Sequence, residues 1–201
     1  MNNANVKPFE RIFNASLTLR RAQLSGEIGT GDVSYLEALL WHFSDQRANR
    51  KPVTISIFTG GGSLDASLAI YDLIQHYHQF FPIDVLAIGP CMSGGVIVMQ
   101  AGRRRLAYPH ARFMTHAVQT IGNPWRKGER NTEATEHFRL QARMEDILAV
   151  RTRVKRSHLR GRTERYFSAS EAVKVGLIDR VVSPATSTAN PVAHHGLALE
   201  A

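Results

Sequence analysis

The segment Gly89–Gly95, with the sequence GPCMSGG, decides how the rest of the chain is arranged. An apolar run precedes the segment and a second one, Val96–Gly102, follows it, so the segment is predicted to join a buried strand to a helix. Ser93 stands before two glycines at the start of that helix, where steric cover is low and unpaired backbone N–H groups are close. Ser93 is therefore a candidate nucleophile, which needs a base, an orienting group and donors for an oxyanion.

The same order of strand, glycine-rich turn and helix occurs immediately before this segment. Val53–Phe58 is β-branched and apolar, Thr59–Ser63 contains three glycines, and Leu64–Tyr77 has apolar residues at helical spacing. Asp84–Gly89 is a second strand of the same kind. Repetition at about thirty residues predicts a parallel sheet with helical crossovers, whose active groups gather at the carboxyl ends of the strands.

The remaining elements are predicted from shorter patterns. Further strands are expected at Arg21–Leu24, Arg105–Tyr108, Ala111–His116 and Leu177–Val182. Helices are expected from Asp32, as the N-cap, to just before Asn49, from about Thr132 to Arg156, and after the capping box Ser168–Ala172, closed by Gly176. The apolar residues of the long helix do not form one clean face, so we expect it to project and to pack against a neighbouring subunit.

Length and composition are those of one globular domain. The chain has 201 residues, so we expect a single domain over 1–182 and a disordered tail over 183–201, where Pro, Thr, Ala and His predominate. Cys91 is the only cysteine, which excludes an internal disulfide framework and fits a reducing compartment. No signal-peptide pattern and no long apolar span is present, so a cytoplasmic protein that does not contact a membrane is expected.

The net charge of +8 does not by itself identify a partner. Most positive charge lies in Arg103–Arg105 and between Arg126 and Arg165, without zinc-finger spacing or an aromatic-rich RNA-binding signature, so nucleic-acid binding is not favoured. Gly60–Gly62 lacks the Lys-Ser/Thr pair of a phosphate loop, and His194–His195 has no accompanying ligand set. We therefore expect no cofactor and no metal.

Several motifs occur in one order and at the spacing of a known family. They are Gly61–Ser63 with Ala69–Asp72, Ser93 with Ala101 and Gly102, Pro109–Met114 with His116, and Ser168–Ala172 with Gly176–Asp179. On these residues the chain, from about Phe9 to Val182, resembles the Clp protease proteolytic subunit family of the Clp protease/crotonase superfamily. The resemblance implies an α/β fold, a crotonase-like repeated β-β-α spiral with a projecting long helix.

The resemblance also implies a serine endopeptidase with a site assembled from distant segments. It makes Ser93 the nucleophile and His116 the general base, with the backbone N–H groups of Gly62 and Gly94 as the oxyanion hole. Histidine can take the serine proton and return it to the leaving amine near neutral pH. Glycines let a substrate carbonyl approach the backbone closely.

The position of the orienting acid departs from the family pattern. The family has an aspartate four residues before the Ser-Ala-x-Glu-Ala segment, and this chain has Glu164, between Arg162 and Arg165. Glutamate can accept a hydrogen bond from the imidazole, although its extra methylene moves the carboxylate. The Gln-Pro pair that usually follows the histidine is Ala117–Val118, and the family's Asp-Arg ring sensor is Arg162–Thr163.

The resemblance implies seven-membered rings, usually two stacked as a tetradecamer, whose inner chamber receives unfolded polypeptide from an AAA+ unfoldase. Two alternatives remain open at the level of sequence. One is a catalytically weak or inactive ring or scaffold subunit, which a fluorophosphonate would fail to label. The other is a crotonase-like acyl-CoA enzyme, which would need a well-placed acidic pair. Cys91 as nucleophile is a distant further option, because a small buried apolar role suits it better.

Overall fold

The computed structural model describes residues 16–45, 49–119, 130–160 and 163–183, without the side chains of 130–134. Its strands are β1 (Arg21–Ile28), β2 (Val53–Gly62), β3 (Ile83–Met92), β4 (Arg105–Ala107), β5 (Arg112–Thr115), β6 (Arg165–Ser168) and β7 (Arg180–Val181). Its helices are α2 (Thr30–Asp45), α3 (Leu64–Tyr77), α4 (Gly94–Ala101), α5 (Arg130–Arg151), α6 (Arg156–Arg160) and α7 (Ala169–Lys174). The strands form one seven-stranded sheet, which confirms the predicted α/β fold class.

Strand β3 lies at the centre of the sheet. The order is β1-β2-β3-β4-β7, and β5 continues the pairing of β3 beyond the end of β4. These pairs are all parallel, as the strand and helix alternation predicted. The carboxyl ends of β2, β3 and β5 therefore meet at one edge.

Strand β6 was not predicted, and it is antiparallel to β5. All four of its residues lie at least partly open to solvent. Such a segment lacks the buried apolar run or the apolar and polar alternation that marks a strand in sequence, so backbone pairing with β5 defines it instead.

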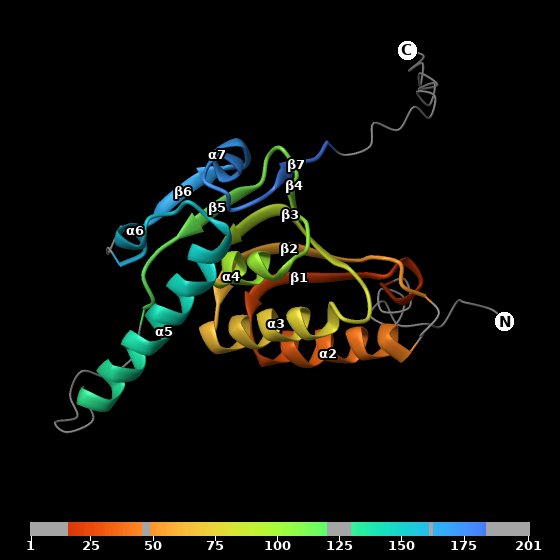
Figure 1. The fold of residues 1–201 in the computed structure, drawn as a ribbon, viewed down its shortest axis with the longest axis horizontal. Coiled ribbons are helices and arrows are strands. Elements are labelled where there is room, and N and C mark those ends of the chain that lie inside the picture. Colours follow the sequence, from red (N-terminus) through yellow and green to blue (C-terminus); the bar gives the residue numbers. More distant parts are fainter. Residues whose placement is uncertain (1–15, 46–48, 120–129, 161–162, 184–201) are drawn as a thin grey trace, which may run out of the picture.

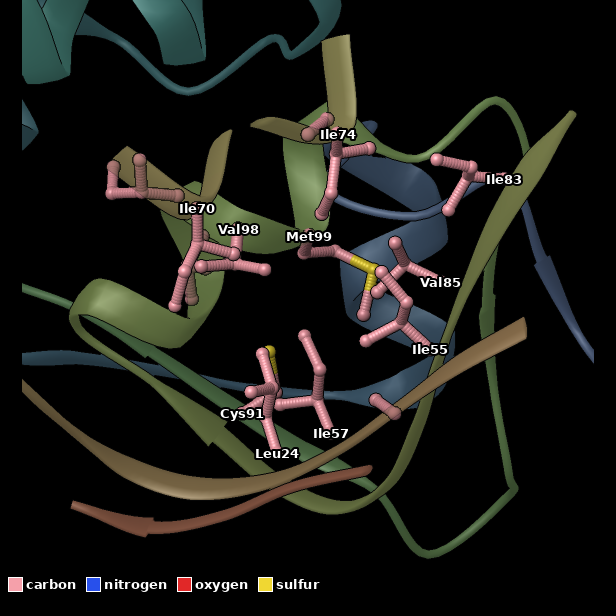
Figure 2. Packing of buried hydrophobic residues seen from close by; sticks show 14 of the residues in the cluster. Leu24, Ile55, Ile57, Ile70, Ile74, Ile83, Val85, Cys91, Val98 and Met99 are labelled. Atoms are coloured by element: carbon pink, nitrogen blue, oxygen red, sulfur yellow. The ribbon is translucent and has the colours of Figure 1, made fainter. Parts of the chain in front are cut away.

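Helices α2 and α3 run side by side next to strands β1 and β2 (Figure 1). Figure 2 shows Met99 of α4 directed at Ile55 and Val85 of the sheet, and Ile70 of α3 beside Val98. All of these residues are fully buried. Burial of each aliphatic side chain of this size stabilises the fold by about 1.5–3 kcal/mol. All eight residues of α4 are buried, so its position in the core is fixed on every side.

Several predicted boundaries are corrected by local hydrogen bonds. Helix α2 begins at Thr30, and Asp32 lies in its first turn, where its carboxylate accepts from the Gly29 N–H at 2.9 Å rather than acting as the N-cap. Strands β2 and β3 continue through the segments expected to be turns, as far as Gly62 and Met92. Helix α3 and the capping box of α7 match the predictions.

The long helix ends at Arg151, five residues before the predicted end. The Arg153 N–H leaves the helical pattern and donates to the Val175 carbonyl at 2.7 Å, and the short helix α6 begins only at Arg156. The last strand is likewise shorter than predicted, because Leu177 and Ile178 are buried in an irregular turn before β7.

Helix α5 extends away from the body of the molecule, as Figure 1 shows, and the predicted projection is present. Phe138 is 70% exposed and Val150 81% exposed on this helix. Its packing against a neighbouring subunit stays a prediction. None of the described helices combines the length and the apolar character that a membrane crossing requires. The basic segment from Ile121 to Gly128, Arg162 of the ring sensor and the tail from residue 184 lie outside the described residues.

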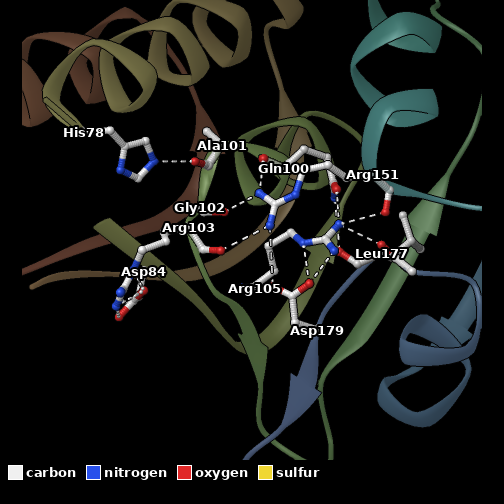
Figure 3. A network of polar contacts seen from close by, with 11 residues as sticks. His78, Asp84, Gln100, Ala101, Gly102, Arg103, Arg105, Arg151, Leu177 and Asp179 are labelled. Carbon is white, nitrogen blue, oxygen red and sulfur yellow. Dashed lines mark hydrogen bonds and ion pairs between the residues drawn. The ribbon is translucent and has the colours of Figure 1, made fainter. Parts of the chain in front are cut away.

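A polar network closes the C-terminal end of α4 (Figure 3). Arg105 is buried, and its guanidinium donates to Asp179 at 2.5 Å and to Gln100 at 2.7 Å. Gln100 also donates to the carbonyls of Val96 and Leu177, each at 3.2 Å. Burial alone would raise the pKa of Asp179, but the hydrogen bonds from Arg105 outweigh it and leave this pKa below its usual value. The network ties the segment before β7 to the core.

Candidate active site

Ser93 lies between β3 and α4, at the N-cap of the helix. Its φ is +51° and its ψ is −118°, and only one other non-glycine residue in the described part of the chain, Arg20, has a positive φ. The Ser93 hydroxyl makes no capping hydrogen bond to the helix. A serine held in such a sharp strand-to-helix turn presents its Oγ outward instead of satisfying its own backbone.

Pairing of β5 with β3 brings His116 to this serine. Met92 and Met114 are register partners, and the Ser93 N–H donates to the Met114 carbonyl at 2.8 Å. Beyond the ends of β3 and β5, His116 Nε2 lies 2.8 Å from Ser93 Oγ. Both side chains are partly exposed, so a ligand can reach them.

The contact made by the second ring nitrogen of His116 determines which of the two nitrogens carries the hydrogen. His116 Nδ1 lies 2.6 Å from the Ala117 carbonyl oxygen. Because a carbonyl can only accept, Nδ1 carries the hydrogen in this contact and Nε2 is left as an acceptor for the Ser93 hydroxyl. This tautomer is the one that general-base catalysis by Nε2 requires.

Gly62 and Gly94 come from different segments and meet beside Ser93. A Cβ built on Gly94 would stand 3.8 Å from the Gly62 nitrogen and 2.3 Å from Ser67 Oγ, so this space is closed to a side chain. Gly94 is the first residue of α4, where backbone N–H groups have no partner within the helix. Gly62 has a φ of +148°, which favours glycine.

Gly61 also borders the serine, although the sequence analysis gave it no role. Its φ is +112°, and a Cβ there would lie 2.7 Å from Ser93 Cβ and 3.2 Å from Ser93 Oγ. The Gly61 N–H donates to the buried Thr59 hydroxyl at 2.9 Å, which holds the glycine segment in place. The segment is therefore shaped around the serine side chain.

Glu164 is not joined to His116 by a hydrogen bond or ion pair in the described conformation. Its Oε2 accepts from the Tyr166 hydroxyl at 2.7 Å, which raises the pKa of that phenol. The register of β5 and β6 pairs Thr115 with Arg165, so Glu164 lies one step further along, at the position opposite His116. The two residues are thus placed across from each other by the backbone while the carboxylate is held elsewhere.

Cys91 lies two residues before the serine and is fully buried. Burial raises the pKa of its thiol, which disfavours the reactive thiolate. The buried apolar role expected for Cys91 is therefore the one its surroundings support.

Sequence reasoning did not find the groups that surround His116 and Glu164. The Ala117 carbonyl is a backbone atom and leaves no mark in a sequence. Tyr166 and Gln141 are ordinary residues of a strand and a helix, and only the pairing of β5 with β6 and the packing of α5 bring them near. Gly61 did carry a signal, because it lies in a run of three glycines before a helix cap.

Comparison with known proteins gives one consistent answer. The family model described as Clp protease matches residues 5–185. The ATP-dependent Clp protease proteolytic subunit 3 of Synechococcus sp. (strain CC9902) is 32% identical over 169 residues, which cover 81% of this chain and 82% of that protein. The ATP-dependent Clp protease proteolytic subunit 2 of Prochlorococcus marinus (strain MIT 9313) is 30% identical over 164 residues, 80% of each chain.

Proposed function

This chain belongs to the Clp protease family, and from that membership and the geometry around Ser93 we propose that it is an active serine endopeptidase subunit. The observation that carries the proposal is the 2.8 Å contact between Ser93 Oγ and His116 Nε2. Its substrates are peptide bonds of unfolded proteins and peptides.

In the first step Ser93 Oγ attacks the carbonyl carbon of the scissile peptide bond. The hydroxyl proton passes to His116 Nε2, the acceptor nitrogen of the described tautomer. Collapse of the tetrahedral intermediate breaks the C–N bond, and His116 returns the proton to the leaving amine. The products of this step are an amine and an acyl ester on Ser93, which water hydrolyses by the same proton route.

The backbone N–H groups of Gly62 and Gly94 stabilise the negative oxygen of the tetrahedral intermediate. The meeting of the two glycine segments beside Ser93 supports this assignment. Loss of one such donor costs about 3 kcal/mol of transition-state stabilisation in serine proteases.

Glu164 is proposed as the carboxylate that orients His116 during turnover. Its register position opposite His116 supports this role. For this role the carboxylate must leave the Tyr166 hydroxyl and adopt another side-chain rotamer, and Glu164 is an exposed residue immediately before β6.

The assembly is proposed from the family. Clp proteolytic subunits form oligomeric rings that work with AAA+ ATPases, and the relatives found here are named as subunits of an ATP-dependent protease. We expect seven-membered rings, singly or stacked in pairs, in which the projecting helix α5 contacts a neighbouring subunit. The exposed Phe138 and Val150 of α5 support such a contact.

A fluorophosphonate probe tests the proposal directly. We expect the intact full-length protein to gain one adduct, located at Ser93 by peptide mass spectrometry. Ser93→Ala should abolish the adduct, and His116→Gln should slow it by at least about a hundredfold. An unmodified wild-type protein after prolonged exposure would refute the peptidase and leave the inactive scaffold subunit of the same family.

A further inference from the structure

The peptide group between Ala117 and Val118 has contacts on both of its sides. Its carbonyl oxygen lies 2.6 Å from His116 Nδ1, and its N–H donates to Gln141 Oε1 at 2.8 Å. A trans peptide group directs its C=O and N–H in opposite directions, so the imidazole and the Gln141 amide lie on opposite sides of one planar unit. Movement of this unit therefore moves the acceptor of the histidine.

Gln141 is itself held by groups buried between α5 and α6. Its Nε2 donates to Glu145 Oε1 at 3.0 Å and to the Leu159 carbonyl at 2.9 Å, and the residue is 8% exposed. With an acceptor and two donors engaged, the orientation of the amide is fixed. The amide cannot rotate without leaving a buried polar group unpaired, which is costly.

Glu145 anchors this chain of contacts. Its side chain is fully buried and receives two hydrogen bonds from Arg160, at 2.7 and 2.8 Å, with Arg156 a further 3.6 Å contact. The hydrogen bonds from Arg160 are the main reason why the pKa of Glu145 lies below its usual value. Its charge, close to the Gln141 amide, favours polarisation of the hydrogen bonds that run on through Val118 to the Ala117 carbonyl.

We propose that Gln141 and Glu145 are positioning residues for His116, acting through the Ala117–Val118 peptide. They hold the Ala117 carbonyl where it fixes the imidazole tautomer and orientation while Glu164 is bound to Tyr166. This inference rests on the proposed peptidase activity. In a simple triad a carboxylate alone orients the histidine, whereas here the Ala117–Val118 peptide group, held by Gln141, is proposed to share that role.

The test compares two buried glutamines in the full-length protein. Gln141→Met removes the support of the Val118 N–H with little change in volume. Gln100→Met is the matched control, because Gln100 is also buried, makes a comparable set of hydrogen bonds and lies near the C-terminal end of α4, whereas Ser93 precedes the N-terminal end. For each variant we measure the rate constant for fluorophosphonate labelling, kcat and KM for a fluorogenic peptide, and the free energy of unfolding.

Both variants should lose similar stability. Only Gln141→Met should label more slowly, by about tenfold, the factor that corresponds to one hydrogen bond of roughly 1.4 kcal/mol. The loss should appear in kcat with KM unchanged, because the orientation of the base matters for the reacting step and not for peptide binding.

Three results would overturn the inference. Wild-type labelling in Gln141→Met would show that the peptide needs no support, and equal losses in Gln141→Met and Gln100→Met would show a general structural effect. If the wild-type protein itself is not labelled, the proposed function fails and the positioning role fails with it. That result is distinguishable from the first two, in which the wild-type protein reacts.

Discussion

Replacement of Gly61 by alanine tests how closely the glycine segment is fitted to the nucleophile. The new Cβ would stand 2.7 Å from Ser93 Cβ, so one of the two must move by roughly 0.7 Å to reach an ordinary contact of 3.4 Å. A displacement of that size opens the 2.8 Å contact between Ser93 and His116. Misplacement of a reacting group by about 1 Å can cost a hundredfold in rate, so labelling of Ser93 should fall by about that factor.

The backbone of Gly61 adds a second cost that must be separated from the first. Its φ of +112° is unfavourable for alanine, and a non-glycine residue at such a position costs about 1–3 kcal/mol. Gly26→Ala is the control, because Gly26 has a φ of +84° and nothing within 4 Å of its built Cβ. It therefore bears the conformational cost without a new contact.

The assay is fluorophosphonate labelling at a fixed probe concentration, with thermal unfolding measured in parallel. Both alanine variants should lose stability, and only Gly61→Ala should lose labelling. A folded Gly61→Ala protein that reacts at the wild-type rate, or a Gly26→Ala protein that loses as much reactivity, would refute the geometric argument.

Three further predictions concern the groups around the site. Tyr166→Phe removes the hydroxyl that holds Glu164 and should raise the rate of Ser93 labelling by about threefold. Adding Glu164→Gln to the same chain should cancel this gain. A labelling rate unchanged in Tyr166→Phe would mean that the Glu164 carboxylate does not reach His116. Glu145→Gln should be less stable than the wild type above the unfolded-state pKa of Glu145, near 4.5, and this difference should shrink as the pH falls through the lower folded-state pKa. Urea unfolding at several pH values measures the difference. A difference in stability that does not change with pH would contradict the charge-based role of Glu145. Cys91 should resist iodoacetamide in the folded protein and react after unfolding, and rapid modification of the native protein would contradict its burial.

The elements that the sequence predicted well are those whose signal is local. Leu64–Tyr77 has a capping serine before it and apolar residues at helical spacing, and the structure has the same helix. The strands β2 and β3 were found from their β-branched cores but predicted too short, because glycine is read as a turn. Here pairing with β1 continues through Gly61 and Gly62, and pairing with β5 continues β3 to Met92.

The elements that were missed or misplaced depend on contacts far away in sequence. Strand β6 exists through pairing with β5, and α5 ends where Arg153 turns to the Val175 carbonyl. The site divides in the same way. Ser93 and His116 follow strands that become neighbours, so topology alone places them together, whereas the rotamer of Glu164 depends on a tyrosine hydroxyl that no spacing rule identifies.

The positive φ of Ser93 lowers the stability of the fold at the same position that supplies the proposed nucleophile. Glycine would relax that backbone at the cost of the hydroxyl, so screening a mutant library by heat resistance would favour Ser93→Gly, a more stable protein that lacks the proposed nucleophile. Directed evolution of a more thermostable variant should therefore select for peptide hydrolysis as well as for stability from the first round.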